Sequence, residues 1–357
     1  MKKQIVSFLC PSFNHESYVK YFLDSLLAQT NPNWELILVD DCSSDNNVSE
    51  INKYKDKRIK LVQNPFNMGI NCGINEAFRK SSGEILTLCA SDDILCVDYV
   101  EVMLKTAQQN PDINVFYTDL LPMDEKNNIT SYSDYRKNFI GNKKDILQKL
   151  FFSCNCMLSP GMAIRRNAFQ ELFPLPISLS IYQDYKMHID LLLRNKFIVL
   201  DSPLVKYRKP NKNSGFSFAN DITERRCKLE ESLLMDSFLQ INDIEKLKEV
   251  FDYKKLKQFE PLDSDFISYY LGMLALQAET EYKQVWGYNQ IVKFINDKKK
   301  YELLNKRYGF CYKDFINLAA FFNECPFKRK YIKYKSLFNG SCVLVAILVI
   351  GLLMTLL

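Results

Sequence analysis

The chain has 357 residues, of which 47% are hydrophobic and 25% are charged, with 11 glycines and 12 prolines. An intrinsically disordered chain would need far fewer apolar residues, and a collagen-like or low-complexity chain would need many more glycines and prolines, so both classes are excluded. The length predicts about two domains. A net charge of +5 is mild for this length, and we therefore expect no nucleic-acid partner.

Short apolar runs alternate with amphipathic stretches over about the first two hundred residues. The apolar runs predict strands at 5–10, 36–39, 59–62, 85–89 and 115–117. Apolar residues at helical spacing predict helices over 19–27, 70–78 and 100–107. This alternation predicts an α/β fold with a doubly wound, mostly parallel sheet. In such a sheet, ligands bind outside the carboxyl ends of the strands.

The pattern changes after Lys209. Residues from about 220 to 335 form long amphipathic runs rich in Lys, Glu, Leu, Phe and Tyr, which predict a helical extension. The stretch 210–220 is rich in Asn, Ser and Gly and is the predicted boundary. We therefore divide the chain into an α/β domain at 1–217 and a helical extension at 218–335.

The last residues, 340–357, are almost entirely apolar. A helix of about 16 residues from Cys342 would span about 24 Å, slightly less than a hydrocarbon core of about 30 Å. Basic and aromatic residues precede it over 327–335, without an acidic residue among them. This combination predicts a membrane anchor at the cytoplasmic face of the cell membrane. The alternative interpretation is a core or oligomer-interface helix.

Polar residues follow four consecutive predicted strands, where ligands are expected. They comprise Pro11, Phe13, Asn14 and Glu16 after the first strand, Asp40 and Asp41 after the second, Asn67 and Gly69 after the third, and Ser91, Asp92 and Asp93 after the fourth. Each group alone is compatible with helix caps or turns. Together, their carboxylates suit a hard divalent cation, and the aromatic ring with nearby Asp and Asn side chains suits a nucleobase and ribose. A glycine-rich dinucleotide fingerprint and a P-loop are both absent from the sequence, so a nucleotide whose diphosphate is held by a metal is the remaining interpretation.

These motifs resemble the family 2 glycosyltransferases, which have a GT-A fold. The resemblance covers about the first 215 residues and rests on the runs Pro11-Ser12-Phe13-Asn14, Val39-Asp40-Asp41-Cys42-Ser43, Gly83-Glu84 and Asp92-Asp93. It implies that Pro11, Phe13 and Asp41 hold the nucleoside base, usually uridine. It also implies that Asp92 lies near the ribose and that Asp93 binds Mg²⁺ or Mn²⁺ on the donor diphosphate.

The acceptor side carries a second part of the resemblance. Residues 159–166 resemble the small-residue strand that lines the family's acceptor pocket, and Asp184 matches its catalytic base, although Gln183 replaces the usual Glu. An inverting transfer needs such a carboxylate to take the proton of the acceptor hydroxyl. The alternative for Asp184 is a helix N-cap.

The sequence also departs from the family pattern at two places. The histidine that many relatives carry after Tyr-Arg is absent at Tyr207-Arg208-Lys209-Pro210, so Arg208, Lys209 or Lys212 is expected to supply the positive charge. A basic residue common in relatives is Ile74 here, which puts that diphosphate contact in doubt.

The resulting hypothesis is an inverting, metal-dependent transferase. It would move a sugar from a nucleotide donor, expected to be a UDP-sugar, to a glycan or lipid-linked saccharide in surface polysaccharide synthesis. Two alternatives stay open, namely transfer to polyprenyl phosphate and a non-catalytic scaffold that binds sugar nucleotides.

Overall fold

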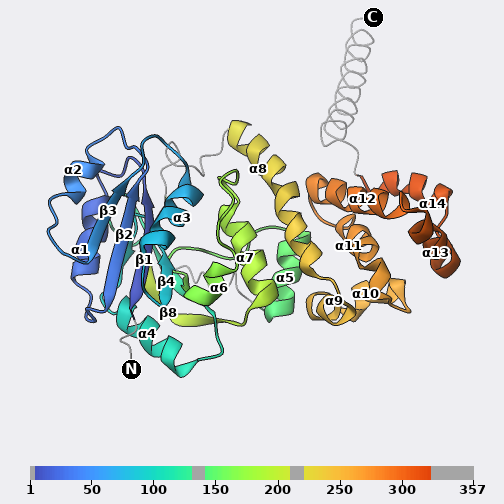
Figure 1. Cartoon of the computed structure of the whole chain (residues 1–357), viewed down its shortest axis with the longest axis horizontal. Coiled ribbons are helices and arrows are strands. Elements are labelled where there is room, and N and C mark those ends of the chain that lie inside the picture. Colours follow the sequence, from blue (N-terminus) through green and yellow to red (C-terminus); the bar gives the residue numbers. More distant parts are fainter. Residues whose placement is uncertain (1–4, 131–140, 210–220, 323–357) are drawn as a thin grey trace, which may run out of the picture.

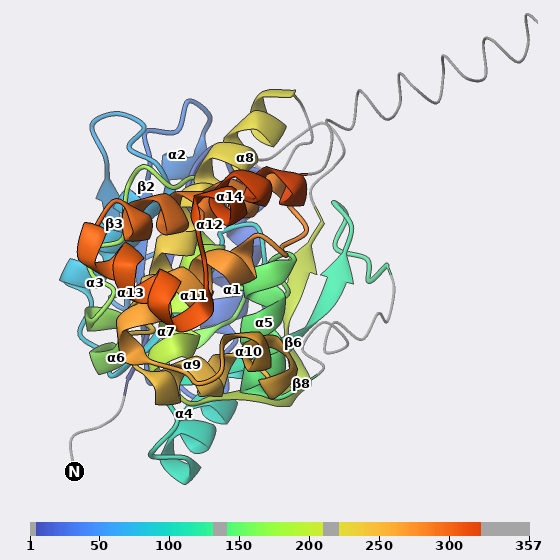
Figure 2. The same ribbon diagram turned by 90° about the vertical axis from the view of Figure 1, so that its right-hand side faces the viewer.

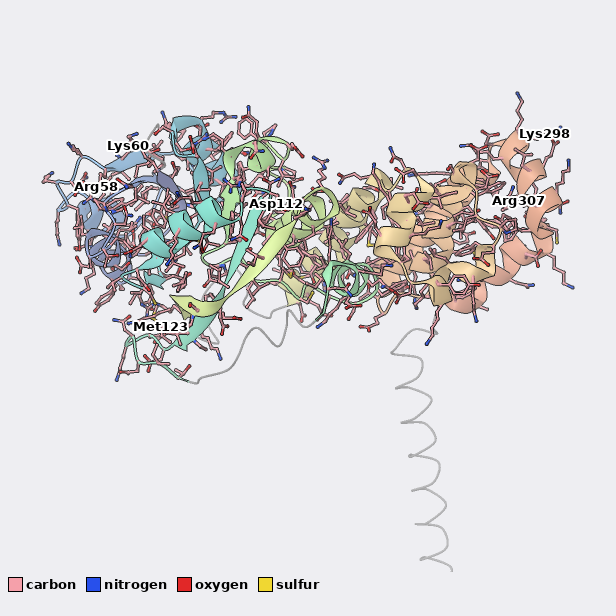
Figure 3. The ribbon with its side chains drawn as sticks, turned by 90° about the horizontal axis from the view of Figure 1, so that it is seen from below. Arg58, Lys60, Asp112, Met123, Lys298 and Arg307 are labelled. Carbon is pink, nitrogen blue, oxygen red and sulfur yellow. The ribbon has the colours of Figure 1, made fainter. Side chains whose placement is uncertain are left out.

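The computed structural model describes residues 5–130, 141–209 and 221–322. Its elements form an elongated molecule, with an α/β domain at one end and a helical extension at the other (Figure 1). Arg58 and Lys60 lie toward the α/β end, and Lys298 and Arg307 lie at the far end of the extension (Figure 3). The predicted apolar segment at 340–357 and its basic flank at 327–335 lie outside the described residues. Within the described ranges, none of the helices combines the length and the apolar character needed to cross a bilayer.

The α/β domain contains one sheet in the strand order β3-β2-β1-β4-β7-β6-β8-β5. The strands are β1 Val6–Ser12, β2 Trp34–Asp40, β3 Ile59–Gln63, β4 Ile85–Leu88, β5 Ile94–Leu95, β6 Val115–Met123, β7 Ala163–Arg165 and β8 Phe197–Arg208. β1, β2, β3 and β4 pair in parallel, whereas β7 is antiparallel to both β4 and β6, and β8 is parallel to β6. The expected doubly wound, mostly parallel sheet of GT-A type is confirmed.

Helices cover both faces of this sheet. They are α1 Val19–Leu27, α2 Asn47–Ile51, α3 Ile70–Lys80, α4 Tyr99–Gln109, α5 Lys143–Phe152, α6 Arg166–Gln170 and α7 Gln183–Arg194. Successive residues of the central strands enter different cores: Phe8 and Leu36 belong to one apolar cluster, and Leu9 and Ile37 to the other. Because both faces are covered, the central strands are continuous apolar runs.

The extension consists of helices, as the sequence predicts. Its α-helices are α8 Asp221–Leu234, α9 Ile244–Val250, α10 Tyr253–Leu256, α11 Ile267–Ala275, α12 Glu281–Ile295, α13 Lys298–Tyr308 and α14 Tyr312–Asn317. Short 3₁₀ turns are η2 Met235–Gln240, η3 Lys257–Phe259, η4 Ser264–Phe266 and η5 Leu318–Phe321. Viewed from this end, the helices lie over α5, α6 and α7 (Figure 2).

The extension shares an apolar core with the α/β domain. The cluster that contains Leu9 and Ile37 continues through Phe151 of α5 to Phe238 and Tyr270 of the extension. The rings of Phe151 and Phe238 meet edge to face, with centroids 4.8 Å apart. The two parts are therefore packed against each other as one hydrophobic body.

Candidate active site

The carboxyl ends of β1, β2 and β4 are joined by a chain of buried hydrogen bonds. Asn47 Nδ2 donates to Asp40 Oδ1 at 2.7 Å and to Ser12 Oγ at 2.9 Å. Ser91 Oγ donates to Ser12 Oγ at 2.7 Å and also lies 2.7 Å from His15 Nδ1. This network connects three of the strand ends at which the sequence predicts ligand-binding residues, and it makes this edge of the sheet rigid.

Asp41 holds the loop that follows β3. Its Oδ1 accepts from Asn64 Nδ2 at 2.7 Å and from Met68 N at 2.8 Å, and its Oδ2 accepts from Gly69 N at 2.8 Å. Gly69 has a φ of +86°, which explains why the loop ends in glycine before α3 begins. Since a carboxylate has about four acceptor positions, Asp41 retains capacity for one further donor.

Asn14 and Glu16 connect the loop after β1 to the loop after β2. Asn14 Oδ1 accepts from Ser44 N at 2.8 Å, and Glu16 Oε2 accepts from Asn46 N at 2.8 Å. These hydrogen bonds join the two loops. Pro11 has a different role, because an added Cβ at Gly73 of α3 would lie 2.9 Å from Pro11 Cβ, so glycine permits this close approach of helix and strand.

Aromatic side chains accompany these loops. Phe13 is half-buried after β1, whereas Phe66 in the loop after β3 is 61% exposed. Asn67, the next residue, is also exposed. Phe13 is the ring that the sequence predicts for a nucleobase. Phe66 is not predicted from the sequence, because an exposed aromatic residue in a loop belongs to no periodic pattern.

Arg208, at the end of β8, forms hydrogen bonds with Asp92 and Asp93. Arg208 N donates to Asp93 Oδ1 at 2.9 Å, and Arg208 Nε donates to the Asp92 carbonyl at 2.8 Å. Burial, together with the charge of Asp92, raises the pKa of Asp93 well above its usual range. A carboxylate in this state gains by binding a cation.

The Arg208 guanidinium is itself engaged within the domain. Its Nη1 donates to the Asp124 carbonyl at 2.7 Å, and its Nη2 lies 2.5 Å from Asn127 Oδ1. Only 3% of Arg208 is exposed, so its role is to join three chain segments. Of the other two cations expected to replace the missing histidine, Lys209 is exposed and Lys212 lies outside the described residues.

Asp184 lies in the first turn of α7 and is half-buried. Ser159 Oγ lies 3.5 Å from Asp184 Oδ2 and 3.3 Å from His188 Nε2, and Tyr117 OH lies 3.0 Å from His188 Nδ1. Burial raises the pKa of Asp184 to about 6, against the lowering effect of hydrogen bonds from Tyr185 N and Ser159. Burial lowers the pKa of His188 to about 3, so this ring is neutral and serves as a support.

The topology places the Asp184 region beside the end of β4. Because β7 is antiparallel to β4, the chain before β7 runs next to the chain that leaves β4. Leu88 N donates to the Met162 carbonyl at 3.1 Å, and Met162 N donates to the Ser159 carbonyl at 2.9 Å. Ser159, which contacts Asp184, is therefore at the same edge of the sheet as Ser91 and Asp93.

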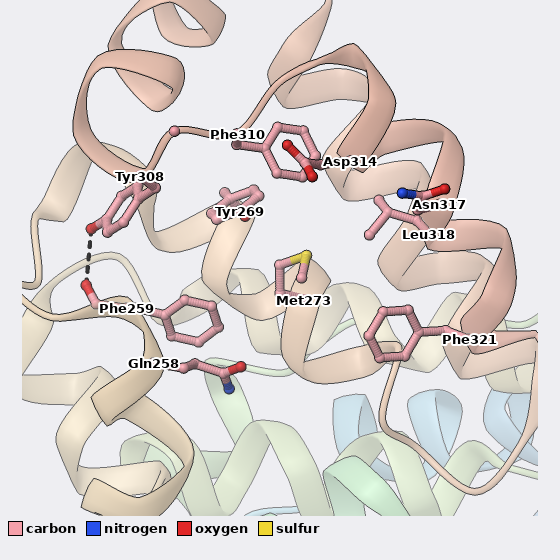
Figure 4. Close-up of a pocket in the computed structure, with 11 residues that line it drawn as sticks. Gln258, Phe259, Tyr269, Met273, Tyr308, Phe310, Asp314, Asn317, Leu318 and Phe321 are labelled. Atoms are coloured by element: carbon pink, nitrogen blue, oxygen red, sulfur yellow. Dashed lines mark hydrogen bonds between the residues drawn. The ribbon is translucent and has the colours of Figure 1, made fainter.

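A separate cavity of about 460 Å³ lies in the extension and belongs to a different part of the molecule (Figure 4). Its lining comes from η3, α11 and the 308–321 segment and includes Phe259, Tyr269 and Phe310. The rings of Tyr269 and Phe310 pack against each other, with centroids 5.7 Å apart. The predicted site residues are absent from this lining.

Residues 7–173 match the family described as glycosyl transferase family 2. An uncharacterized glycosyltransferase of Methanocaldococcus jannaschii is 28% identical over 61% of this chain and 75% of its own length. The Escherichia coli UDP-Glc:alpha-D-GlcNAc-diphosphoundecaprenol beta-1,3-glucosyltransferase WfgD is 34% identical over 31% of this chain, which spans 44% of that relative.

Solved structures of Staphylococcus aureus TarS 1–349 show the same fold. The complex with UDP has a TM-score of 0.56 at 17% identity and covers 87% of this chain and 93% of its own. The complex with UDP-GlcNAc has a TM-score of 0.53 at 19% identity, with the same coverage. The family 2 match covers residues 7–173 of this chain, and the two curated relatives above are glycosyltransferases.

Proposed function

We propose that this enzyme is an inverting transferase that moves a sugar from a UDP-linked donor to a glycan or lipid-linked saccharide in surface polysaccharide synthesis. The observation that carries the proposal is Asp184, a half-buried carboxylate with a pKa raised to about 6, beside the sheet edge that bears Ser91 and Asp93. The UDP donor is supported by the UDP-Glc donor in the name of WfgD and by the UDP and UDP-GlcNAc complexes of TarS. The lipid-linked acceptor is supported by the name of WfgD.

The chemistry at Asp184 is a proton transfer coupled to substitution. Asp184 takes the proton of the acceptor hydroxyl while that oxygen forms a bond to the anomeric carbon. The bond between the anomeric carbon and the diphosphate oxygen breaks, and its electron pair leaves with UDP. A base with a pKa near 6 is ionised at neutral pH and is stronger than an exposed aspartate.

The donor binds at the loops held by Asp41, Asn14 and Glu16. Asp41 has acceptor capacity for a base N–H, and Phe13 or Phe66 offers a ring face to the nucleobase. Asp40 and Ser91 are buried, and their hydrogen bonds are made within the protein. Their contribution to donor binding is therefore to hold the shape of the site.

We propose that Asp93, with Asp92 beside it, holds Mg²⁺ or Mn²⁺ together with the donor diphosphate. Within the described part of the chain, His, Cys, Asp and Glu side chains form no group of three or more able to hold a metal. A Mg²⁺ ion bound by one or two carboxylates and by substrate phosphates does not need such a group, so the residues fit. The ion would neutralise the charge that develops on the departing diphosphate.

The location of the enzyme is proposed from sequence. The apolar residues 340–357 and their basic flank support attachment to the cytoplasmic face of the cell membrane. A lipid-linked acceptor would be found at the same surface.

The test is UDP release by the purified full chain. UDP-glucose and UDP-N-acetylglucosamine are offered with Mn²⁺ and a GlcNAc-diphospholipid acceptor, and the product is examined for inversion at the anomeric carbon. Asp184→Asn should lower kcat by at least a hundredfold and leave binding of UDP unchanged. Asp93→Asn should lower the Mn²⁺-dependent affinity for UDP, measured by calorimetry. Unchanged turnover in both variants would overturn these roles.

A further inference from the structure

The helical extension contacts the chain segment that immediately precedes Asp184. The backbone N–H groups at the start of a helix lack partners within the helix. The N-cap residue of α7, Tyr182, makes no side-chain cap hydrogen bond. Glu230 of α8 instead binds the N-cap amide and the two residues before it, with Oε2 accepting from Tyr182 N at 2.8 Å and Ile181 N at 2.9 Å and Oε1 from Ser180 N at 3.0 Å.

The Glu230 carboxylate is well satisfied in this position. Its Oε1 also accepts from Ser180 Oγ at 2.9 Å, so each oxygen receives two hydrogen bonds. Only 4% of Glu230 is exposed, and the charge lies at the positive end of α7. Asp184 follows Tyr182 by two residues, and its direction therefore depends on the segment that Glu230 holds.

A second residue of the extension holds the other side of Asp184. Lys283 of α12 is completely buried, and its Nζ donates to the Leu150 carbonyl at 3.0 Å, the Ser153 carbonyl at 2.7 Å and Tyr185 OH at 3.0 Å. Tyr185 OH in turn donates to the Leu150 carbonyl at 2.6 Å. Tyr185 N also donates to Asp184 Oδ1 at 2.6 Å. Lys283 thus connects the end of α5 to the residue that directly follows the base.

We propose that Glu230 and Lys283 are positioning residues for Asp184, so that the helical extension completes the active site. The proposal rests on the proposed function, because it requires Asp184 to be the base. The extension is then a part of the catalytic unit: it fixes the chain immediately before and after the carboxylate, while the α/β domain supplies the donor loops. A base displaced by about 1 Å loses roughly a hundredfold in rate.

The primary variants are Glu230→Gln and Lys283→Met, which keep the side-chain volume nearly constant. A glutamine offers only one acceptor oxygen. Its amide NH₂ group would face either the N–H groups of residues 181 and 182 or that of residue 180, and it cannot accept a hydrogen bond from them. A methionine at 283 leaves the Ser153 carbonyl without its donor and removes one of the two donors to the Leu150 carbonyl. Matched controls are Glu224→Gln on α8, where Glu224 pairs with Lys228 on the surface, and Lys293→Met on α12, which is exposed.

The measurement is UDP release from UDP-glucose or UDP-N-acetylglucosamine with the GlcNAc-diphospholipid acceptor. We expect kcat to fall about ten- to a hundredfold in Glu230→Gln and Lys283→Met, with the donor KM within about twofold and both controls near wild type. Hydrogen exchange of the amides at 181 and 182 should accelerate in Glu230→Gln. Loss of UDP binding in calorimetry would show that a variant does not fold. Glu230→Asp and Lys283→Arg, which retain the charge, then replace it and should lower kcat less.

A double-mutant comparison separates positioning from a general loss of structure. In an Asp184→Asn background, Glu230→Gln should cause no further fall in the residual rate, because the base it positions is already absent. A purely structural effect would lower that residual rate by the same factor as in the wild type and would overturn the proposal. Wild-type kcat in both primary variants would also overturn it. If Asp184→Asn itself leaves turnover unchanged, the proposed function fails, which is a distinguishable result.

Discussion

Burial disfavours the ionised form of Asp184, the same form in which it would act as a base. Its pKa is raised to about 6, so the activity of a base in this position should depend on pH just below neutrality. We expect kcat/KM to be nearly constant above pH 7 and to fall about tenfold per pH unit below pH 6. UDP release between pH 4.5 and 8.5 measures this. A profile that stays flat down to pH 5 would contradict the role of Asp184.

The same shift predicts a stability change in Asp184→Asn. The folded pKa is raised from 3.8 to about 6, so ionisation of Asp184 opposes folding above pH 6, and this cost is absent below about pH 4. Asparagine is neutral at every pH. The variant should therefore be more stable than wild type by up to about 3 kcal/mol at pH 8, at about 1.36 kcal/mol per pKa unit, and the gain should disappear at pH 4.

Urea unfolding at the two pH values measures this difference, and Asp190→Asn on the same helix is the matched control. Asp190 Oδ2 pairs with Lys186 Nζ at 2.6 Å, and Oδ1 accepts from Gln240 Nε2 at 2.6 Å. The ionised form of Asp190 is therefore stabilised in the folded protein. Asp190→Asn should lose stability at pH 8. A loss in Asp184→Asn at pH 8 would show that its carboxylate is satisfied in the folded state.

At the scale of the elements, α11 and α12 pack closely through Gly272 and Gly287. An added Cβ at Gly287 would lie 2.6 Å from the Gly272 carbonyl oxygen, and one at Gly272 would lie 2.9 Å from the Gly287 carbonyl oxygen. Gly287→Ala should therefore lower the free energy of unfolding by about 1–3 kcal/mol, although alanine favours a helix more than glycine does.

Urea unfolding of Gly287→Ala and of Val285→Ala on the same helix provides the comparison. Val285 is 40% exposed, so its truncation should change stability by less than about 0.5 kcal/mol. A stabilised Gly287→Ala variant would mean that the two helices move apart at no cost.

The strands and helices of the α/β domain are predictable from the sequence, because their apolar periodicity is strong. β1 extends to Ser12 and β2 to Asp40, slightly beyond the predicted ends, since Pro11 and Asp40 keep extended backbone after the apolar run stops. The periodicity does not predict β5, β8, α2, α5 or α6. β5 has only two residues, and the apolar run of β8 is interrupted by polar residues where its ladder with β6 shifts register near Asp119.

The candidate site is predictable where it follows strand ends and not where it depends on contacts across the chain. Asp184 is recognisable from the helix that it opens. Ser12 and Asn47 bind each other over 35 residues of sequence, and Glu230 reaches Ser180 over 50. Such contacts leave no periodic pattern in a single sequence, because they are defined by how the helices dock.

At the scale of the whole molecule, the shared core predicts that the α/β domain and the extension unfold together. Burial of Phe151, Phe238 and Tyr270 in one cluster couples the two parts. The chain offers a direct measurement, since its two tryptophans, Trp34 in β2 and Trp286 in α12, lie one in each part.

Trp34→Phe and Trp286→Phe each leave one fluorescent reporter. We expect Trp286 and Trp34 to report the same thermal transition. Calorimetry of each variant measures how far the substitution itself shifts the melting temperature, and the two transitions should agree once that shift is subtracted. Two transitions separated within one variant would show that the extension detaches before the α/β domain melts.

The buried amine of Lys283 also gives the docked arrangement a chemical reporter. Burial lowers the pKa of Lys283 to about 8, and the side chain is closed to solvent, so an acylating reagent can reach this nitrogen only when α12 leaves α5. Exposed lysines such as Lys293 are accessible at all times and provide an internal reference for reagent potency. Pulse acylation followed by mass spectrometry would therefore measure how often the extension separates from the α/β domain in the intact enzyme. If a bound donor slows acylation of Lys283, donor binding stabilises the contact between these two parts.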